Sequence, residues 1–161
     1  MKILNLIKFI EDDFDDYFSL VSNEKVMAQI TEYAIPFEEA QLNFQKLLIR
    51  NNKYDHYGSY KIYDSSKNEF IGLGHLTLDE DNNEVAEIGY MIKPEYWGKG
   101  YDGEIAKLLI EKAKKVELKS IKAIIDPDNI ASRKILINEG FISEMIVEID
   151  GLPGEILMKK L

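Results

Sequence analysis

Residues 86–103, with the sequence AEIGYMIKPEYWGKGYDG, are the most informative segment of the chain. Residues 84–92 are predicted to form a strand. Gly98, Gly100 and Gly103 follow within six positions, and apolar residues then recur at helical spacing over residues 103–116. Another strand is predicted at residues 121–125. A strand, a glycine turn, a helix and a strand form a βαβ unit, so at least one parallel strand pair is expected.

The segments on either side of this unit predict one mixed sheet with helices on its faces. Aromatic and β-branched runs between polar turns indicate an antiparallel meander before the unit, and a glycine turn indicates a hairpin after it. Further helices are expected at residues 11–21, 23–30, 36–51 and 129–138, and further strands at residues 3–9, 57–63, 69–78, 142–149 and 155–160. The predicted fold class is α/β (α+β): a mostly antiparallel central sheet of about seven strands flanked by helices, in a single domain spanning residues 1–161.

Charge and composition argue against several classes of function. Twenty Lys and Arg against 29 Asp and Glu give a net charge of −9, without the basic footprint of a nucleic-acid binder. The first residues do not resemble a secretory signal, and no apolar run reaches the roughly 20 residues that span a bilayer. We therefore expect no nucleic-acid or membrane partner, and an acidic surface favours cationic partners. The absence of cysteine excludes thiolate nucleophiles and fits a cytoplasmic location.

The glycine-rich loop at residues 98–103 has the composition of an anion site. Glycines allow the backbone to approach a ligand, and the helix that follows begins with free N–H groups and the positive end of its dipole. Lys99 adds a cation. The familiar P-loop and dinucleotide-binding patterns are both absent, and a glycine-rich loop before a helix is often only a tight turn. The loop by itself therefore leaves both interpretations open.

Two segments together resemble the acetyl-CoA-binding core of the GNAT superfamily of N-acetyltransferases. The first is the strand and loop over residues 86–101. The second is residues 129–141, NIASRKILINEGF, which begins with Asn and ends in Gly-Phe as the second cofactor element of that family does. The resemblance is strongest over residues 84–142, and the most similar branch is the ribosomal-protein N-terminal acetyltransferase-like group. The resemblance to this family implies a GNAT-type fold with acetyl-CoA as co-substrate.

The resemblance also implies a role for each matching position. Backbone groups at the end of the fourth strand would pair with the pantetheine arm, loop amides would hold the pyrophosphate, and the second element would flank the cofactor. The implied cofactor-binding residues are Met91, Ile92, Gly98, Lys99, Gly100, Tyr101, Asp102, Gly103, Asn129, Ser132 and Lys134. Asn129 could instead serve only as a helix N-cap, and Lys134 only as a solvated helix charge.

Asp102 departs from the family pattern, which has Gly or Ala at this position of the loop. A carboxylate beside a pyrophosphate is unfavourable unless it points away or is offset by another charge. In one interpretation Asp102 turns outward and caps a helix that starts at Gly103. In the other, cofactor binding is weakened or lost.

Acetyl transfer to an amine requires a base that deprotonates the nucleophile. Glu87 matches the strand glutamate that has this role in several relatives, and partial burial would raise its pKa toward neutrality. The alternatives are that Glu87 faces water or pairs with a cation, or that Glu84 is the base. His56 and His75 are interpreted as structural, and no third ligand accompanies them, so no metal is expected.

Acetyl transfer also requires an acid or a hydrogen-bond donor for the departing thiolate. Many family members have a Tyr in the second element for this purpose, but this sequence has Leu136 there. In the most similar branch a Ser has been assigned this role at the position of Ser132. Ser132 is therefore our candidate acid or thiolate stabiliser, with a simple helix-capping role as the alternative.

The predicted function is transfer of acetyl from acetyl-CoA to a primary amine by direct attack in a ternary complex, since no residue is a convincing covalent carrier. The acceptor would be a peptide N-terminus or a small cationic amine, held in a pocket near Tyr33 and the helices before it. A non-catalytic acyl-CoA-binding or regulatory module and a plain interaction domain remain as alternatives. The oligomeric state is open, including a homodimer formed through the last hairpin.

Overall fold

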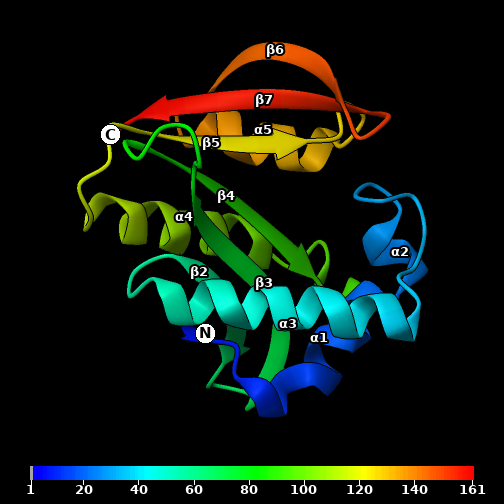
Figure 1. Ribbon diagram of the computed structural model, residues 1–161. Helices are drawn as coiled ribbons and strands as arrows, with labels where there is room; N and C mark the ends of the chain where they lie inside the picture. The colour runs from blue at the N-terminus through cyan, green and yellow to red at the C-terminus, as the bar shows by residue number, and fades with distance from the viewer. Residues whose placement is uncertain (1) are drawn as a thin grey trace.

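The computed structural model describes residues 2–161 and shows a seven-stranded sheet with helices on both faces (Figure 1). Met1 lies outside the described residues. The strands are β1 (Leu4–Lys8), β2 (Gly58–Asp64), β3 (Glu69–Leu78), β4 (Val85–Ile92), β5 (Ser120–Ile125), β6 (Ile142–Ile149) and β7 (Leu152–Lys160). The helices are α1 (Phe14–Val21), α2 (Glu24–Met27), α3 (Phe37–Lys53), α4 (Tyr101–Lys114) and α5 (Ile130–Asn138), with short 3-10 turns η1 (Glu11–Asp13) and η2 (Pro94–Tyr96).

The strand order is β1-β2-β3-β4-β5-β7-β6, and every neighbouring pair is antiparallel except β4 and β5. The predicted fold class and the predicted parallel pair are therefore confirmed. The parallel pairing covers only Val85–Glu87 of β4 against Ser120–Lys122 of β5. Beyond these residues β4 and β5 separate, and their backbones no longer form hydrogen bonds with each other. This separation is the feature of the fold that positions the site.

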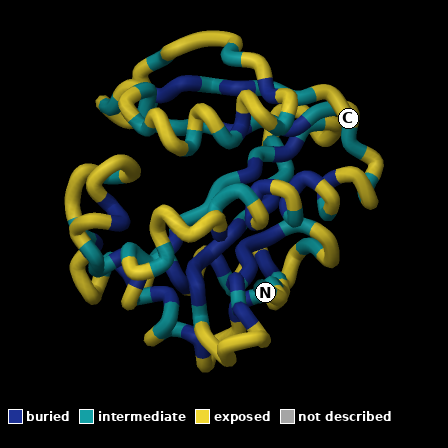
Figure 2. Tube along the Cα trace, turned by 180° about the vertical axis from the view of Figure 1, so that it is seen from behind, coloured by how far each residue is buried: buried dark blue, intermediate teal, exposed yellow. Residues whose placement is uncertain are grey.

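Two apolar clusters fill the two faces of the sheet. Figure 2 shows the buried residues concentrated along the central strands, with exposed residues on the outer helices. Alternate residues of β4 serve different clusters: Ile88 and Ile92 pack with α4, whereas Met91 packs with the cluster built on α1 and α3. This division follows from the two-residue period of a strand.

Three element boundaries differ from the sequence-based expectation. Helix α4 begins at Tyr101, not at Gly103, because Gly100 already adopts the left-handed conformation (φ +83°) at the N-cap. Helix α2 is only four residues long, where residues 23–30 were expected to be helical; its N-cap is Asn23, whose side chain accepts the amides of Lys25 and Val26. Strand β7 begins at Leu152 because the hairpin closes through a tighter two-residue turn at Asp150 and Gly151, both with positive φ. Within residues 2–161, no helix combines the length and the apolar character needed to cross a membrane.

Candidate active site

A cavity of about 350 Å³ opens where β4 and β5 separate. Its walls are residues 88–92 of β4, residues 123–126 at the end of β5, residues 96–98 leading into the glycine loop, and the first turn of α5. Residues 25–30, in and after α2, close the opposite side. In Figure 1 this region lies between α2 and the layer formed by β5, β7 and α5. The cavity therefore joins the two segments on which the family resemblance rests.

The glycine loop presents free backbone donors at one end of the cavity. Gly98 and Gly100 have φ of +70° and +83°, a conformation that favours glycine. Among the hydrogen bonds of residues 2–161, none is donated by the backbone amides of residues 98–102. Several of these amides precede or begin α4, where the helix dipole favours an anion. The loop is thus open and can accept a phosphate group.

Tyr101 contributes its backbone to this loop, but its side chain lies elsewhere. The ring is 1% exposed, and the hydroxyl donates a hydrogen bond to Oδ2 of the buried Asp64 at 2.8 Å. Burial, reinforced by Asp64, raises the pKa of Tyr101 to about 12. The ring of Tyr96 packs edge-on against Tyr101, and its hydroxyl donates to Glu69 at 2.6 Å. These contacts fasten the first turn of α4 to β2 and β3, an anchor that the sequence did not reveal.

Asp102 lies in the first turn of α4 and also lines the cavity. Its Oδ1 accepts the N–H of Gly103 at 3.0 Å, so one amide of the helix start is already engaged. This contact is not the expected N-cap, because α4 begins at Tyr101 and Gly100 is its N-cap. The expected outward orientation also differs from the structure, in which Asp102 is one of the residues that line the cavity. Lys99 is exposed and is not part of the cavity wall.

The first turn of α5 forms the middle of the cavity wall. Asn129 is the N-cap of α5, and its Oδ1 accepts the N–H of Ser132 at 3.2 Å. Both residues line the cavity. The capping contact uses only the side-chain oxygen of Asn129, so the side-chain NH₂ group takes no part in it. Lys134 is exposed and does not line the cavity, as expected for a solvated helix charge.

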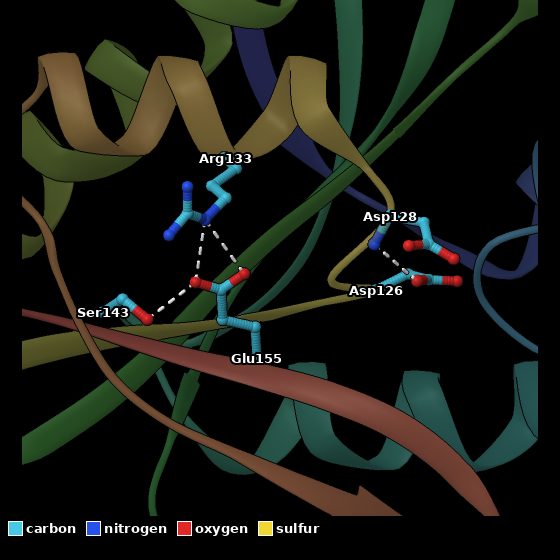
Figure 3. Close-up of polar contacts among 5 residues, drawn as sticks. All are labelled: Asp126, Asp128, Arg133, Ser143 and Glu155. Atoms are coloured by element: carbon cyan, nitrogen blue, oxygen red, sulfur yellow. Dashed lines mark hydrogen bonds and ion pairs between the residues drawn. The ribbon is translucent and has the colours of Figure 1, made fainter.

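A buried glutamate in β7 holds this turn of α5 in place (Figure 3). Glu155, 2% exposed, accepts hydrogen bonds from Nε of Arg133 at 2.9 and 3.1 Å and from the Ser143 hydroxyl at 2.6 Å. The Ser143 hydrogen bond and Arg133 hold the pKa of Glu155 below its ordinary value against the opposing effect of burial. In the preceding loop, Oδ1 of Asp126 accepts the N–H of Asp128 at 2.9 Å. Sequence reasoning missed Glu155, whose only signal was an acidic residue at the start of the strand expected at residues 155–160.

Glu87 lies on the same face of β4 as Gly89 and Met91, which line the cavity, but it is not itself part of the cavity wall. Burial raises the pKa of Glu87, and the Asp79 charge adds to the rise while Lys122 opposes it. Lys122 is the cross-strand neighbour of Glu87, yet it forms its ion pair with Asp79 at 2.9 Å. Glu87 therefore has a raised pKa, and the neighbouring Lys122 is paired with Asp79 instead.

His75 lies close to Glu87 on the neighbouring strand β3. It is the cross-strand neighbour of Gly89, and a Cβ on Gly89 would be 2.4 Å from its Nε2. That nitrogen is 4.0 Å from Oε2 of Glu87, while Nδ1 contacts Oγ1 of Thr77 at 3.1 Å. Burial, with a smaller effect of the Arg50 charge, lowers the pKa of His75 to about 4. His75 is thus neutral near pH 7, and the contact with Glu87 is not an ion pair.

The opposite wall differs from the expected acceptor pocket at Tyr33, which is 51% exposed and bonds to Glu39 outside the cavity. The segment before Tyr33 does contribute to the cavity, through Lys25, Val26, Gln29 and Ile30 in and after α2. Sequence reasoning also missed Tyr90, which lines the cavity from β4. Among residues 2–161 there is no group of three or more potential ligand side chains that could hold a metal ion.

Comparison with known proteins places this cavity in a familiar context. A family model described as "Acetyltransferase (GNAT) domain" matches residues 4–142. The uncharacterized N-acetyltransferase YjdG of Bacillus subtilis is 35% identical over 107 residues, which are 66% of this chain and 64% of that protein. The chain therefore spans less than two thirds of this relative.

Two solved structures share the fold at low sequence identity. The spermidine N-acetyltransferase from Vibrio cholerae, in complex with CoA and spermine, superposes with a TM-score of 0.81 at 20% identity, over 98% of this chain and 95% of that one. The ribosomal L7/L12 α-N-protein acetyltransferase RimL, in complex with coenzyme A, gives 0.80 at 19% identity, over 98% and 94%. At these identities the likeness concerns the fold alone.

Proposed function

This chain belongs to the GNAT acetyltransferase family, and we propose that it transfers the acetyl group of acetyl-CoA to a primary amine. The observation that supports this most directly is the open glycine loop: the amides of residues 98–102 donate no hydrogen bond, and Gly98 and Asp102 line the cavity between β4 and β5. A diphosphate needs several N–H donors at a helix start, and this loop supplies them. The cysteine-free sequence fits a cytoplasmic enzyme.

The diphosphate, the pantetheine arm and the thiol end of coenzyme A would each contact a different part of the cavity wall. The loop amides would hold the diphosphate. Met91 and Ile92 lie where β4 has left β5, so an extended pantetheine arm could pair with this edge as an added strand, although the Ile92 carbonyl already accepts a hydrogen bond from Nε1 of Trp97 at 2.9 Å. Asn129 and Ser132 lie across the cavity on α5, where their side chains could reach the thiol end. When bound, acetyl-CoA supplies an activated thioester.

The amine must lose a proton to attack the thioester. Glu87 has a raised pKa and lies just behind the cavity wall, so it would accept this proton through water or along His75 rather than by direct contact. In the transfer the nitrogen–carbon bond forms and the carbon–sulfur bond breaks, with its electron pair remaining on sulfur. Ser132 would stabilise that sulfur by a hydrogen bond.

The acceptor we propose is a cationic amine or a peptide N-terminus. The net charge of −9 attracts cations, and Asp126 places a carboxylate in the cavity wall. Two proteins with the same fold are named for spermidine and for a ribosomal protein, and both names are compatible with these two acceptor classes. The ribosomal-protein branch is part of the proposal.

A non-catalytic acyl-CoA-binding module is the second candidate, favoured by the Asp102 carboxylate at the anion site. Release of free thiol from acetyl-CoA, measured over a panel of polyamines, aminoglycosides and peptides, separates the two when combined with calorimetry of CoA binding. Turnover with any amine supports the enzyme. Tight CoA binding without turnover supports the module, and an absence of CoA binding rejects both.

A further inference from the structure

The hydroxyl of Tyr90 is buried and has no hydrogen-bond partner among residues 2–161. A buried polar group without a partner is unfavourable, and most buried hydroxyls in proteins are paired. Phenylalanine at this position would keep the ring contacts with the α4 cluster and avoid the unpaired donor. The hydroxyl therefore requires an explanation other than packing.

Tyr90 reaches the cavity between the first turns of two helices. It lies on the same face of β4 as Ile88 and Ile92, and the two polar side chains that act on its hydroxyl are Ser132 of α5 and Asp102 of α4. All three of these polar residues line the cavity. Burial raises the pKa of Tyr90 to about 12, with Ser132 opposing the rise and Asp102 adding to it. The phenol therefore remains a hydrogen-bond donor throughout the physiological pH range.

The hydroxyl of Ser132 can accept the hydrogen bond that Tyr90 has available. Its backbone N–H is engaged by Asn129, but its hydroxyl makes no hydrogen bond within residues 2–161. A hydroxyl that donates its one proton to a sulfur keeps two lone pairs that can accept. Tyr90 and Ser132 line the same cavity, and Ser132 is close enough to the Tyr90 phenol to act on it by hydrogen bonding. Tyr90 could therefore donate to Oγ while Ser132 donates to a ligand.

We propose that Tyr90 is a positioning residue for Ser132: its hydroxyl donates to Oγ of Ser132 and directs the serine proton toward the sulfur of coenzyme A. This inference rests on the proposed acetyl transfer. Both hydroxyls keep their protons during the reaction. The carbon–sulfur bond breaks with its electron pair on sulfur, the thiolate is held by Ser132, and it takes its proton from water on release. With CoA bound, Tyr90 would donate to Ser132 and Ser132 would donate to the sulfur.

The direct test is the pKa of the thiol of bound CoA, followed by the ultraviolet absorbance of the thiolate in a pH titration. With the wild-type protein the bound thiol should titrate at a lower pH than the thiol of free CoA measured under the same conditions. Tyr90→Phe should raise the pKa of the bound thiol, and Ser132→Ala should raise it further. Because Tyr90 acts through Ser132, the double variant should match Ser132→Ala alone.

Turnover with a responsive amine provides the second readout. Tyr90→Phe should lower kcat about fivefold, the effect of one hydrogen bond, with KM for acetyl-CoA unchanged. Its thermal midpoint should stay constant or rise, because an unpaired donor is removed. Tyr60→Phe is the matched control: it removes a tyrosine hydroxyl that bonds to the His56 carbonyl outside the cavity, and it should leave kcat and the thiol pKa unchanged.

The two ways of failing differ. If CoA binds and the bound thiol has the same pKa in wild type and Tyr90→Phe, or if the two substitutions act additively, the role of Tyr90 is refuted while acetyl transfer stands. If CoA does not bind to the wild type, the proposed function fails and this inference fails with it.

Discussion

Tyr101→Phe is the substitution that most directly tests how the anion loop is held. Oδ2 of Asp64 accepts a hydrogen bond from the Tyr101 hydroxyl, whereas Oδ1 accepts from the Ile3 amide and from the amide and hydroxyl of Ser66. Removing one hydroxyl therefore leaves a buried carboxylate oxygen without its donor. The ring stays in place, so the change isolates the hydrogen bond.

The expected loss of stability follows from the burial of Asp64, which is 0% exposed. A hydrogen bond to a charged group contributes about 1.5–3 kcal/mol, so we expect a loss of about 2 kcal/mol and a fall of about 4–8 °C in Tm for a chain of this size. Because Tyr101 begins α4, the loop amides should also be held less firmly, and CoA affinity should fall.

The pH dependence of stability provides an independent check. Burial alone would raise the pKa of Asp64, but the hydrogen bonds from Ser66, Tyr101 and the Ile3 amide outweigh it and lower the pKa from 3.8 to about 2. A carboxyl with a lowered folded-state pKa stabilises the fold above its unfolded pKa, and this contribution is lost as the pH falls toward 2. Without Tyr101 the folded pKa rises, so acid unfolding should begin at a higher pH.

The assay is thermal and urea unfolding between pH 2 and pH 7, together with CoA calorimetry, for wild type, Tyr101→Phe and the Tyr60→Phe control. Tyr60→Phe should lower the free energy of unfolding by about 1 kcal/mol at every pH, because the Tyr60 hydroxyl donates to a neutral carbonyl. A Tyr101 variant that matches the control in both size and pH dependence would refute the role assigned to the Asp64 contact.

Three further predictions concern the cavity. Asp102→Ala should bind CoA as tightly as wild type or about two- to tenfold more tightly in calorimetry, since a negative charge leaves the anion site; a tenfold loss would instead give the carboxylate a positive role. Glu87→Gln should lower turnover with CoA affinity unchanged. Because the pKa of Glu87 is raised, wild-type kcat/KM should fall as the pH drops through that pKa, and this acid limb should vanish in the variant; unchanged rates would exclude Glu87. Gly89→Ala should displace His75, whose Nε2 would lie 2.4 Å from the new Cβ, and so lower both Tm and turnover; wild-type values for both would mean that the ring moves freely.

Local patterns were sufficient to predict much of the fold. The alternation of strand residues, the glycine run at residues 98–103 and the cap at Asn129 are short-range features, and each element formed within a few residues of its expected position. The parallel pair also followed from the order of elements, because a helix that connects two strands of one sheet normally returns the chain in the same direction.

The roles of individual side chains in the site depended on contacts between distant segments. Tyr101 looked like a loop residue, but its ring is buried against a strand 37 positions away. Glu155 holds the turn of α5 that carries Ser132, through Arg133. Neither contact has a sequence signature, because the partners meet only after the sheet has assembled.

The amino-acid order by itself determined the strands, the helices and the glycine loop, since these depend on backbone preferences and on the period of apolar residues over a few neighbours. Which side chains border the cavity was settled by the separation of β4 from β5 and by the packing of helices on the two faces of the sheet. Tyr90 and Asp102 are thereby brought beside Ser132, whereas Glu87 is left behind the wall. Long-range packing fixes such distances, and no local pattern in the chain encodes them.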